Sequence, residues 1–256
     1  MSEAITEAVI LMAGAGSRFQ RNGETRLKPL VPIAGQPLIC YLLDMLVGSG
    51  IKTIHTVLGF ERELLRRELD SLIPPELDVN WIENPQWQLK NGVSLLAAAP
   101  HVQTPFLLTM ADHLFAETIV DLLIAEQHHG LLNVAIDRKV DSIFDLKDAM
   151  KVRTRDNYVV AIGKELTSYD AIDTGVFVCP PSFFAYLEQA KQNGDCSLAD
   201  GVQAMARDRL VRAIDIGAAW WQDVDTPEML RCAEKHVRAE HRRQERQRTR
   251  ERALAR

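Results

Sequence analysis

The stretch EAVILMAGAGSRF, residues 7–19, decides the fold of this 256-residue chain. Its first seven residues are an apolar run of strand length, and a loop with two glycines, Gly14 and Gly16, follows at once. A buried strand that ends in a glycine loop is typical of the start of an α/β sheet, where ligands bind beyond the carboxyl ends of the strands. We therefore expect a binding site at this end of the first strand.

Outward from this stretch, apolar runs of strand length alternate with segments that show the three-and-four spacing of amphipathic helices. The predicted strands are residues 7–13, 52–58, 79–82, 105–111 and 131–136. The predicted helices are residues 36–47, 60–72, 91–99 and 117–128. This alternation predicts an α/β three-layer αβα sandwich, with a mainly parallel mixed sheet covered by helices on both faces.

The alternation breaks after residue 136. Residues 150–164, MKVRTRDNYVVAIGK, contain two alternating runs on either side of Asp156 and Asn157, which predicts an inserted β-hairpin. We expect this hairpin to form a rim over the pocket and to contact a second substrate. The sheet is expected to resume at residues 174–179 and 210–216, and a further apolar run, 216–222, ends at Asp223.

Composition divides the chain into a globular domain, residues 1–230, and a basic helical tail, residues 231–256. The tail holds 10 of the 30 Lys and Arg residues but only 4 of the 35 Asp and Glu residues. An acidic body argues against nucleic acid as a partner, whereas the tail is expected to be a solvated helix that allows peripheral contact with a membrane. An oligomer is possible. No signal peptide or transmembrane segment is expected, and four widely spaced cysteines predict reduced thiols and a cytoplasmic protein.

The loop after the first strand has the composition of a phosphate-binding loop. Its glycines allow backbone N–H groups to approach anionic oxygens, and Arg18 and Lys28 can neutralise the charge of a triphosphate. Phe19 stands where a dinucleotide-binding fingerprint has its third glycine, and no Gly-Lys-Ser/Thr follows. Two glycines after a strand also fit a simple tight turn, so the basic pair carries the phosphate-binding interpretation.

Carboxylates follow two of the predicted strands. Asp112 follows one buried run, and Asp223 and Asp225 follow another. Asp112 and Asp225 could hold one Mg²⁺, which uses one or two carboxylates together with water and substrate phosphates. The alternative is that each aspartate caps the helix after it. We expect His113 to be a pocket residue rather than a metal ligand.

Taken together, these segments resemble the nucleotidyltransferases of the glycosyltransferase-A-like fold over residues 8 to about 232. The opening motifs are LMAGAGSRF and LKPLVPIAGQPLI, and the last is WQDVDTPEML. ENPQWQLKNGVSLLAA, MADHLF, KDAMKV and VVAIGKELTSYDAIDTGVF lie between them. Because of the block ending in DAIDTGVF, the chain most resembles the CTP:inositol-1-phosphate cytidylyltransferases within this superfamily. Some members of that group are domains of bifunctional enzymes.

The resemblance implies an enzyme that uses Mg²⁺, CTP and inositol 1-phosphate, or a similar phosphorylated polyol or sugar, and releases pyrophosphate. It implies Arg18 and Lys28 as catalytic residues and Asp112 and Asp225 as Mg²⁺ ligands. The implied nucleotide-binding residues are Ala13, Gly14, Gly16, Ser17, Asn84, Asn91 and Ser94. The implied acceptor-binding residues are Lys151, Lys164, Asp173 and Thr174.

The sequence departs from the family pattern at Lys90, which replaces a glycine in the base-recognition stretch and opens the question of which base is bound. Met12 and Leu27 also depart from it. The family's fused membrane domain is not found, which suggests a stand-alone enzyme. We expect substitution of Lys28 by alanine to reduce turnover far more than stability, because a cation in a flexible loop contributes little packing.

Three other functions remain open on the sequence. Asp223-Val224-Asp225 resembles the metal-binding DxD of glycosyltransferases, although its place near the end of the domain argues against that class. A nucleotidyltransferase for another sugar, alditol or aminoalcohol phosphate, or for a phosphonate, would use the same motifs. A nucleotide sensor without catalysis is the third, and the combined presence of both cations and both carboxylates disfavours it.

Overall fold

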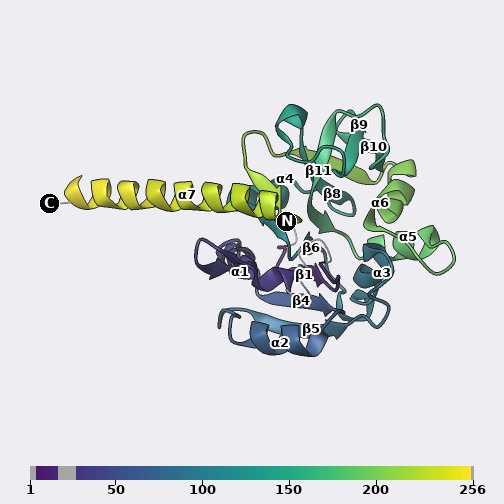
Figure 1. Cartoon of the computed structure of the whole chain (residues 1–256). Helices are drawn as coiled ribbons and strands as arrows, with labels where there is room; N and C mark the ends of the chain where they lie inside the picture. Colours follow the sequence, from purple (N-terminus) through teal and green to yellow (C-terminus); the bar gives the residue numbers. More distant parts are fainter. Residues whose placement is uncertain (1–3, 17–26, 255–256) are drawn as a thin grey trace.

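The computed structural model of the chain describes residues 4–16 and 27–254. Nine strands form one mixed sheet in the order β5-β4-β1-β6-β11-β8-β12-β10-β9, and Figure 1 shows helices against both of its faces. The strands are β1 (Glu7–Met12), β4 (Thr53–Leu58), β5 (Asp78–Glu83), β6 (Phe106–Met110), β8 (Leu132–Asp137), β9 (Lys151–Arg155), β10 (Tyr158–Gly163), β11 (Ala171–Cys179) and β12 (Val211–Asp215). Strands β10 and β11 run opposite to the other seven, which confirms the mainly parallel mixed sheet.

The alternating side chains of the strands divide the apolar core between the two faces of the sheet. Val9 and Leu11 of β1 join one cluster, which helices α3 (Asn91–Leu96), α5 (Phe183–Ala190) and α6 (Leu198–Arg207) cover. Ala8 and Ile10 join the opposite cluster, which helices α1 (Leu38–Gly48), α2 (Arg62–Asp70) and α4 (Glu117–Glu126) cover. The three-layer αβα sandwich predicted from the sequence is confirmed.

The predicted hairpin is present as β9 and β10, joined by Asp156 and Asn157. Both turn residues have positive φ, 53° and 60°, which suits the right-handed twist of a two-residue hairpin and which Asp and Asn tolerate better than most residues. The hairpin extends the main sheet, because β10 pairs with β12 and β9 also pairs with β11.

The strand predicted at residues 216–222 is present only at its end, and it does not belong to the main sheet. Strand β12 ends at Asp215, and the chain turns at Gly217, whose φ is +58°. A separate short strand, β13 (Trp221–Asp223), then pairs with β7 (His113–Phe115), so that Asp223 lies opposite His113. Periodicity missed this two-stranded sheet because its strands are three residues long, and the pairing brings Asp225 to Asp112.

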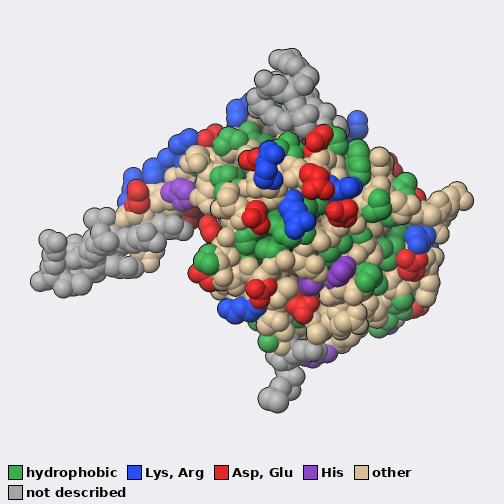
Figure 2. Space-filling view, turned by 90° about the horizontal axis from the view of Figure 1, so that it is seen from below, with side chains coloured by type: hydrophobic (Ala, Val, Ile, Leu, Met, Phe, Trp, Pro, Cys, Tyr) green, Lys and Arg blue, Asp and Glu red, His purple; other side chains and the backbone are tan. Residues whose placement is uncertain are grey.

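The last helix, α7 (Pro227–Leu254), begins at a cap made by Thr226, whose Oγ1 accepts the backbone N–H of Met229 at 3.2 Å. Its first turns pack on the body through Ala233 and Val237, and the rings of Trp220 and His236 stack at 3.7 Å. Beyond these turns the helix projects from the body (Figure 1), and Figure 2 shows basic side chains along it. In the described part of the chain, no helix is both long and apolar enough to cross a bilayer.

A short strand pair and three 3-10 turns complete the described fold. Strands β2 (Pro32–Ile33) and β3 (Gln36–Pro37) form a short hairpin ahead of α1. The 3-10 helix Lys28–Leu30 precedes it and contacts α1, so Lys28 is held by the body of the domain. Further 3-10 turns lie at Ala99–His101 and Val140–Ser142.

Candidate active site

Two cavities lie side by side at the carboxyl edge of the sheet and share four lining residues, Asn91, Met110, Asp112 and Asp225. The smaller cavity has a volume of about 310 Å³ and the larger of about 430 Å³. The two aspartates therefore lie where the contents of both cavities meet. Such an arrangement suits a reaction that joins two bound molecules.

Lys28 lies between the two shared carboxylates. Its Nζ is 2.5 Å from Asp112 Oδ2 and also pairs with Asp225 Oδ1, and the lysine is only 9% exposed. Burial on its own would lower the pKa of Lys28, but the charges of Asp112 and Asp225 outweigh burial and raise the pKa above its ordinary value. Lys28 is thus a fixed cation at the junction of the cavities.

His113 binds the other oxygen of Asp112. Its Nδ1 is 2.6 Å from Asp112 Oδ1, and its ring stacks with that of Trp221 at a centroid separation of 6.4 Å. Burial lowers the pKa of His113, whereas Asp112 and Asp223 raise it more, so the net shift is upward. Burial likewise raises the pKa of Asp112, but Lys28 and His113 reverse this and hold that pKa well below its ordinary range. Lys28 and His113 therefore favour the ionised form of Asp112.

The helix-capping alternative fails for both aspartates. Helix α4 begins after Ala116 with no side-chain cap, and Thr226 caps α7. The carboxylates of Asp112 and Asp225 instead share the ammonium of Lys28.

Residues 8–255 match the family of the MobA-like NTP transferase domain. The chain belongs to this family. It is 34% identical over 230 residues to the bifunctional IPC transferase and DIPP synthase of Thermococcus kodakarensis, covering 89% of this chain and 50% of that protein. The relative of the same name in Rubrobacter xylanophilus is 33% identical over 233 residues, which are 90% of this chain and 51% of that protein. The chain thus spans about half the length of these curated relatives.

Solved structures share the fold of this chain. The inositol-1-phosphate CTP transferase of T. maritima is 27% identical, with a TM-score of 0.79, and the match covers 90% of this chain and 93% of that one. A UDP-glucose pyrophosphorylase complexed with UDP-glucose gives a TM-score of 0.76 at 18% identity, over 92% and 99% of the two chains. The second likeness shows the fold alone.

Most of the predicted nucleotide-binding residues line the smaller cavity. Its lining includes Ala13, Gly14, Gly16, Lys28, Asn91 and Ser94. Asn84 lies behind this wall, where it is 3% exposed and donates from Nδ2 to Ser94 Oγ at 3.0 Å. Ser17 and Arg18 lie outside the described residues. Asn84 can therefore orient Ser94 but does not itself line the cavity.

Lys90, which departs from the family pattern within the base-recognition stretch, lines neither cavity. Its Nζ lies 3.8 Å from Asp200 Oδ2 on α6, and its side chain is 60% exposed. Its backbone N–H donates to Asp195 Oδ1 at 2.9 Å. The question that this lysine raised about base choice therefore finds no support in the geometry.

The predicted acceptor-binding residues divide into two pairs. Lys164 and Asp173 line the larger cavity. Thr174 does not, because it is fully buried and its hydroxyl donates to the carbonyl of Ala135 at 2.9 Å. The expectation for Lys151 also needs correction, since the residue is 9% exposed and its ammonium donates to the carbonyl of Lys164 at 2.5 Å. Both residues support the wall rather than contacting its contents.

Burial raises the pKa of Asp173 to about 6. Its Oδ1 accepts the backbone N–H of Gly175 at 2.8 Å, which offsets only part of that effect. Gly175 has a φ of +75°, and a Cβ there would lie 2.6 Å from His113 Nε2. A glycine is therefore required beside the paired histidine and carboxylates.

Sequence reasoning missed several residues that line the larger cavity. The rim comes from residues 142–150 rather than from the hairpin strands, and Phe144 on it is 52% exposed. Asp137, Lys139 and Trp221 also line the cavity. The pattern that identified Asp112, a carboxylate directly after a buried run, was present for Asp137 as well and could have found it.

Proposed function

We propose that this chain transfers the cytidylyl group of CTP to inositol 1-phosphate, giving CDP-inositol and pyrophosphate, with Mg²⁺ as cofactor. The observation that carries the proposal is the meeting of two cavities at Asp112 and Asp225, with Lys28 between these carboxylates. The similarity to the T. maritima enzyme, which extends over nearly the whole of both chains, supports CTP and inositol 1-phosphate as the substrates.

The smaller cavity is proposed to hold CTP. Its glycine-containing wall at Gly14 and Gly16 allows backbone N–H groups to approach the triphosphate, and Lys28 lines the same cavity. Asn91 and Ser94, from the start of α3, are left for the base and ribose. Arg18 is proposed to add a second cation to this triphosphate site.

Asp112 and Asp225 fit a magnesium ion. The Lys28 ammonium contacts an oxygen of each carboxylate, which shows that the two converge on the position of one cation. Among the described residues, no group of three or more His, Cys, Asp or Glu forms a metal cage. Two carboxylates completed by water and phosphate oxygens are the usual ligands of Mg²⁺ in phosphate chemistry. A bound Mg²⁺ would neutralise charge on the reacting phosphates.

The larger cavity is proposed to hold the acceptor. Asp173 can accept hydrogen bonds from the hydroxyl groups of a polyol, and Lys164 can donate to its oxygens. An acceptor in this cavity would meet CTP at the residues that the two cavities share, Asn91, Met110, Asp112 and Asp225.

The chain then needs no nucleophile of its own. The acceptor phosphate supplies the attacking oxygen, the new P–O bond forms at the α-phosphorus, and the bond to pyrophosphate breaks. The cavities position two anions that repel each other in solution, and Lys28 stabilises the negative charge that develops.

Asp223 lies on β13 opposite His113, and Asp112 rather than Asp223 shares the Lys28 ammonium with Asp225. This pairing disfavours the glycosyltransferase alternative.

A second candidate keeps the reaction and changes the acceptor. Trp220, Trp221 and Phe144 line the larger cavity together with several aspartates, a combination that also suits the cationic head of an aminoalcohol phosphate. We rank this candidate below inositol 1-phosphate because the T. maritima similarity favours the polyol.

The test is pyrophosphate release with Mg²⁺ across four nucleoside triphosphates and a panel of inositol, sugar, alditol and aminoalcohol phosphates. Release that needs CTP and inositol 1-phosphate together is the expected result, and Asp112→Asn should abolish it. Release with another pair would replace the substrates and keep the reaction. If folded protein releases no pyrophosphate with any pair of substrates, the proposal is contradicted and a nucleotide sensor is favoured.

A further inference from the structure

The larger cavity has few cations for the phosphate of an acceptor. Among the described residues that line it, two are lysines, Lys139 and Lys164, whereas seven are aspartates. A phosphate monoester is close to a dianion at neutral pH, so these carboxylates would repel it unless a cation meets it directly. The Lys151 predicted for this task is engaged with backbone carbonyl groups in the wall.

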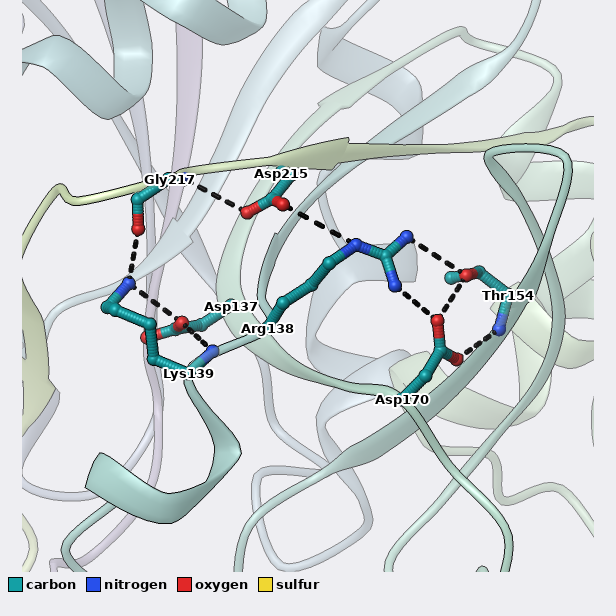
Figure 3. Close-up of polar contacts among 7 residues, drawn as sticks. All are labelled: Asp137, Arg138, Lys139, Thr154, Asp170, Asp215 and Gly217. Atoms are coloured by element: carbon teal, nitrogen blue, oxygen red, sulfur yellow. Dashed lines mark hydrogen bonds and ion pairs between the residues drawn. The ribbon is translucent and has the colours of Figure 1, made fainter.

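The backbone of Lys139 is fixed by a hydrogen bond, and its side chain is accessible. Its backbone N–H donates to Asp137 Oδ1 at 2.7 Å, and its ammonium donates to the same oxygen at 2.8 Å. The ammonium also donates to the carbonyl of Gly217 at 2.6 Å, as Figure 3 shows. The side chain of Lys139 is 42% exposed, whereas that of Asp137 is 3% exposed.

A chain of contacts leads from Lys139 to the shared carboxylates. Asp137 Oδ2 accepts the indole N–H of Trp221 at 2.9 Å, and Trp221 stacks with His113. His113 in turn contacts Asp112 at 2.6 Å. Lys139 thus lies on the same wall of the cavity as the shared carboxylates. The other lysine of this cavity, Lys164, pairs instead with Asp148 of the rim, at 2.5 Å.

The neighbouring Arg138 is turned to other partners. Its guanidinium pairs with Asp170 and donates to Thr154 Oγ1 at 3.0 Å, and its Nε lies 3.4 Å from Asp215 Oδ2. These contacts hold the hairpin to the end of β12, and Figure 3 shows them on the side away from the Lys139 ammonium. Of these two adjacent cations, Lys139 is the one that lines the cavity.

We propose that Lys139 binds the phosphate group of the acceptor and holds it for attack. This inference rests on the proposed function, because it takes the larger cavity as the acceptor site. An ammonium has three N–H donors, so a phosphate oxygen can take the third or replace the Gly217 carbonyl. Asp137 keeps two other donors, the Lys139 backbone N–H and the Trp221 indole, and so stays hydrogen-bonded when the ammonium moves.

The test compares Lys139→Gln and Lys139→Arg with a control, Lys191→Gln. Lys191 pairs with Glu188 on α5 and lines neither cavity, so its loss removes one positive charge elsewhere. The glutamine amide can still donate to Asp137, and equal melting temperatures would show that the fold is intact. We expect Lys139→Gln to raise the KM for inositol 1-phosphate about 10-fold or more, since a charge-assisted hydrogen bond is lost. The KM for CTP should change less than about twofold, and Lys139→Arg should recover most of the acceptor affinity.

An unchanged acceptor KM in Lys139→Gln would overturn the inference and leave the proposed function standing. An equal rise for CTP and acceptor would also overturn it, because that indicates general damage to the site. The assay includes glycerol phosphate and choline phosphate as further acceptors. If only one of these is used, the proposed acceptor is wrong, and a 10-fold rise in the KM for that compound still supports Lys139. If the wild type uses no phosphate acceptor, both proposals fail.

Discussion

Lys28 Nζ donates to Asp112 Oδ2 at 2.5 Å across a sequence separation of 84 residues. The same ammonium pairs with Asp225, which is 197 residues from Lys28. Three segments from the beginning, middle and end of the domain therefore meet at one cation. This point is also where the two cavities join, so the geometry of the site depends on the whole fold.

Replacing Lys28 should affect both catalysis and stability. The expectation that its loss would spare stability was based on a flexible loop, but Lys28 is buried between two carboxylates. Lys28→Met leaves these carboxylates facing each other, and we expect a loss of about 2 kcal/mol in the free energy of unfolding. Turnover should fall at least about 100-fold. Urea denaturation and pyrophosphate release check the two effects, with Lys191→Met as control. A variant with normal turnover would refute the role of Lys28.

Magnesium should stabilise Lys28→Met more than the wild type. In the wild type the ammonium already neutralises Asp112 and Asp225, so the ion must compete with it. In the variant the carboxylates are left for the ion, and its binding to the folded state raises the melting temperature. Thermal melts with and without Mg²⁺, in the absence of nucleotide, measure the difference. Equal shifts in both proteins would show that the ion does not bind at these carboxylates.

A methyl group at Gly175 should damage the site by steric contact. Its Cβ would lie 2.6 Å from His113 Nε2, and the residue has a φ of +75°. Gly175→Ala should therefore displace His113 from Asp112 and reduce turnover by about 100-fold, a loss comparable to that of other site residues. Gly130 is the matched control, because its φ of +73° is similar but nothing lies within 4 Å of its Cβ position. Gly130→Ala should cost only about 1 kcal/mol of stability and keep full turnover. Equal turnover in the two variants would contradict this account.

The raised pKa of Asp173 predicts a pH-dependent gain of stability for Asp173→Asn. Burial raises this pKa from 3.8 to about 6, so ionisation destabilises the folded state. Well below pH 3.8 the carboxyl group is protonated in both the folded and unfolded states, and the variant should gain little. Between pH 4 and 6 the wild type loses stability, and above pH 6 the difference should be constant at up to about 3 kcal/mol.

Urea denaturation of both proteins at pH 4 and pH 7.5 checks this prediction. Asparagine keeps the acceptor for the Gly175 N–H, so the turn there should persist. We also expect a higher KM for the acceptor, because an amide oxygen is a weaker hydrogen-bond acceptor than a carboxylate. A variant with the same gain at both pH values would show that the pKa of Asp173 is not raised by burial.

The sequence predicted the sheet and its helices because their signals are local. The buried strands are continuous apolar runs, and the hairpin turn at Asp156 and Asn157 combines two residues that tolerate positive φ. The bounds and the partner of the short strand β13 escaped prediction, since three residues carry no measurable period. Its pairing with β7 is a tertiary contact that places Asp223 opposite His113.

The sequence predicted some residues of the candidate site and not others. Residues at the ends of buried runs, such as Asp112, could be found because parallel strands bring their carboxyl ends together. Lys151 and Thr174 belong to the acceptor block of the resemblance, but sequence could not show that their polar atoms are already bonded to backbone carbonyls. Lys139 was overlooked because an isolated lysine after a strand looks like any exposed residue until Asp137 and Gly217 are seen to hold it.

The most direct test of the central claim is a ³¹P NMR measurement on CTP, inositol 1-phosphate and Mg²⁺ with the purified chain. The account predicts that the α-phosphorus of CTP becomes coupled to the acceptor phosphorus in a new diphosphate diester, with an equal amount of pyrophosphate. Asp112→Asn and Asp225→Asn should leave the spectrum of the substrates unchanged. If the wild type, shown to be folded, also leaves both substrate signals unchanged, the account is contradicted.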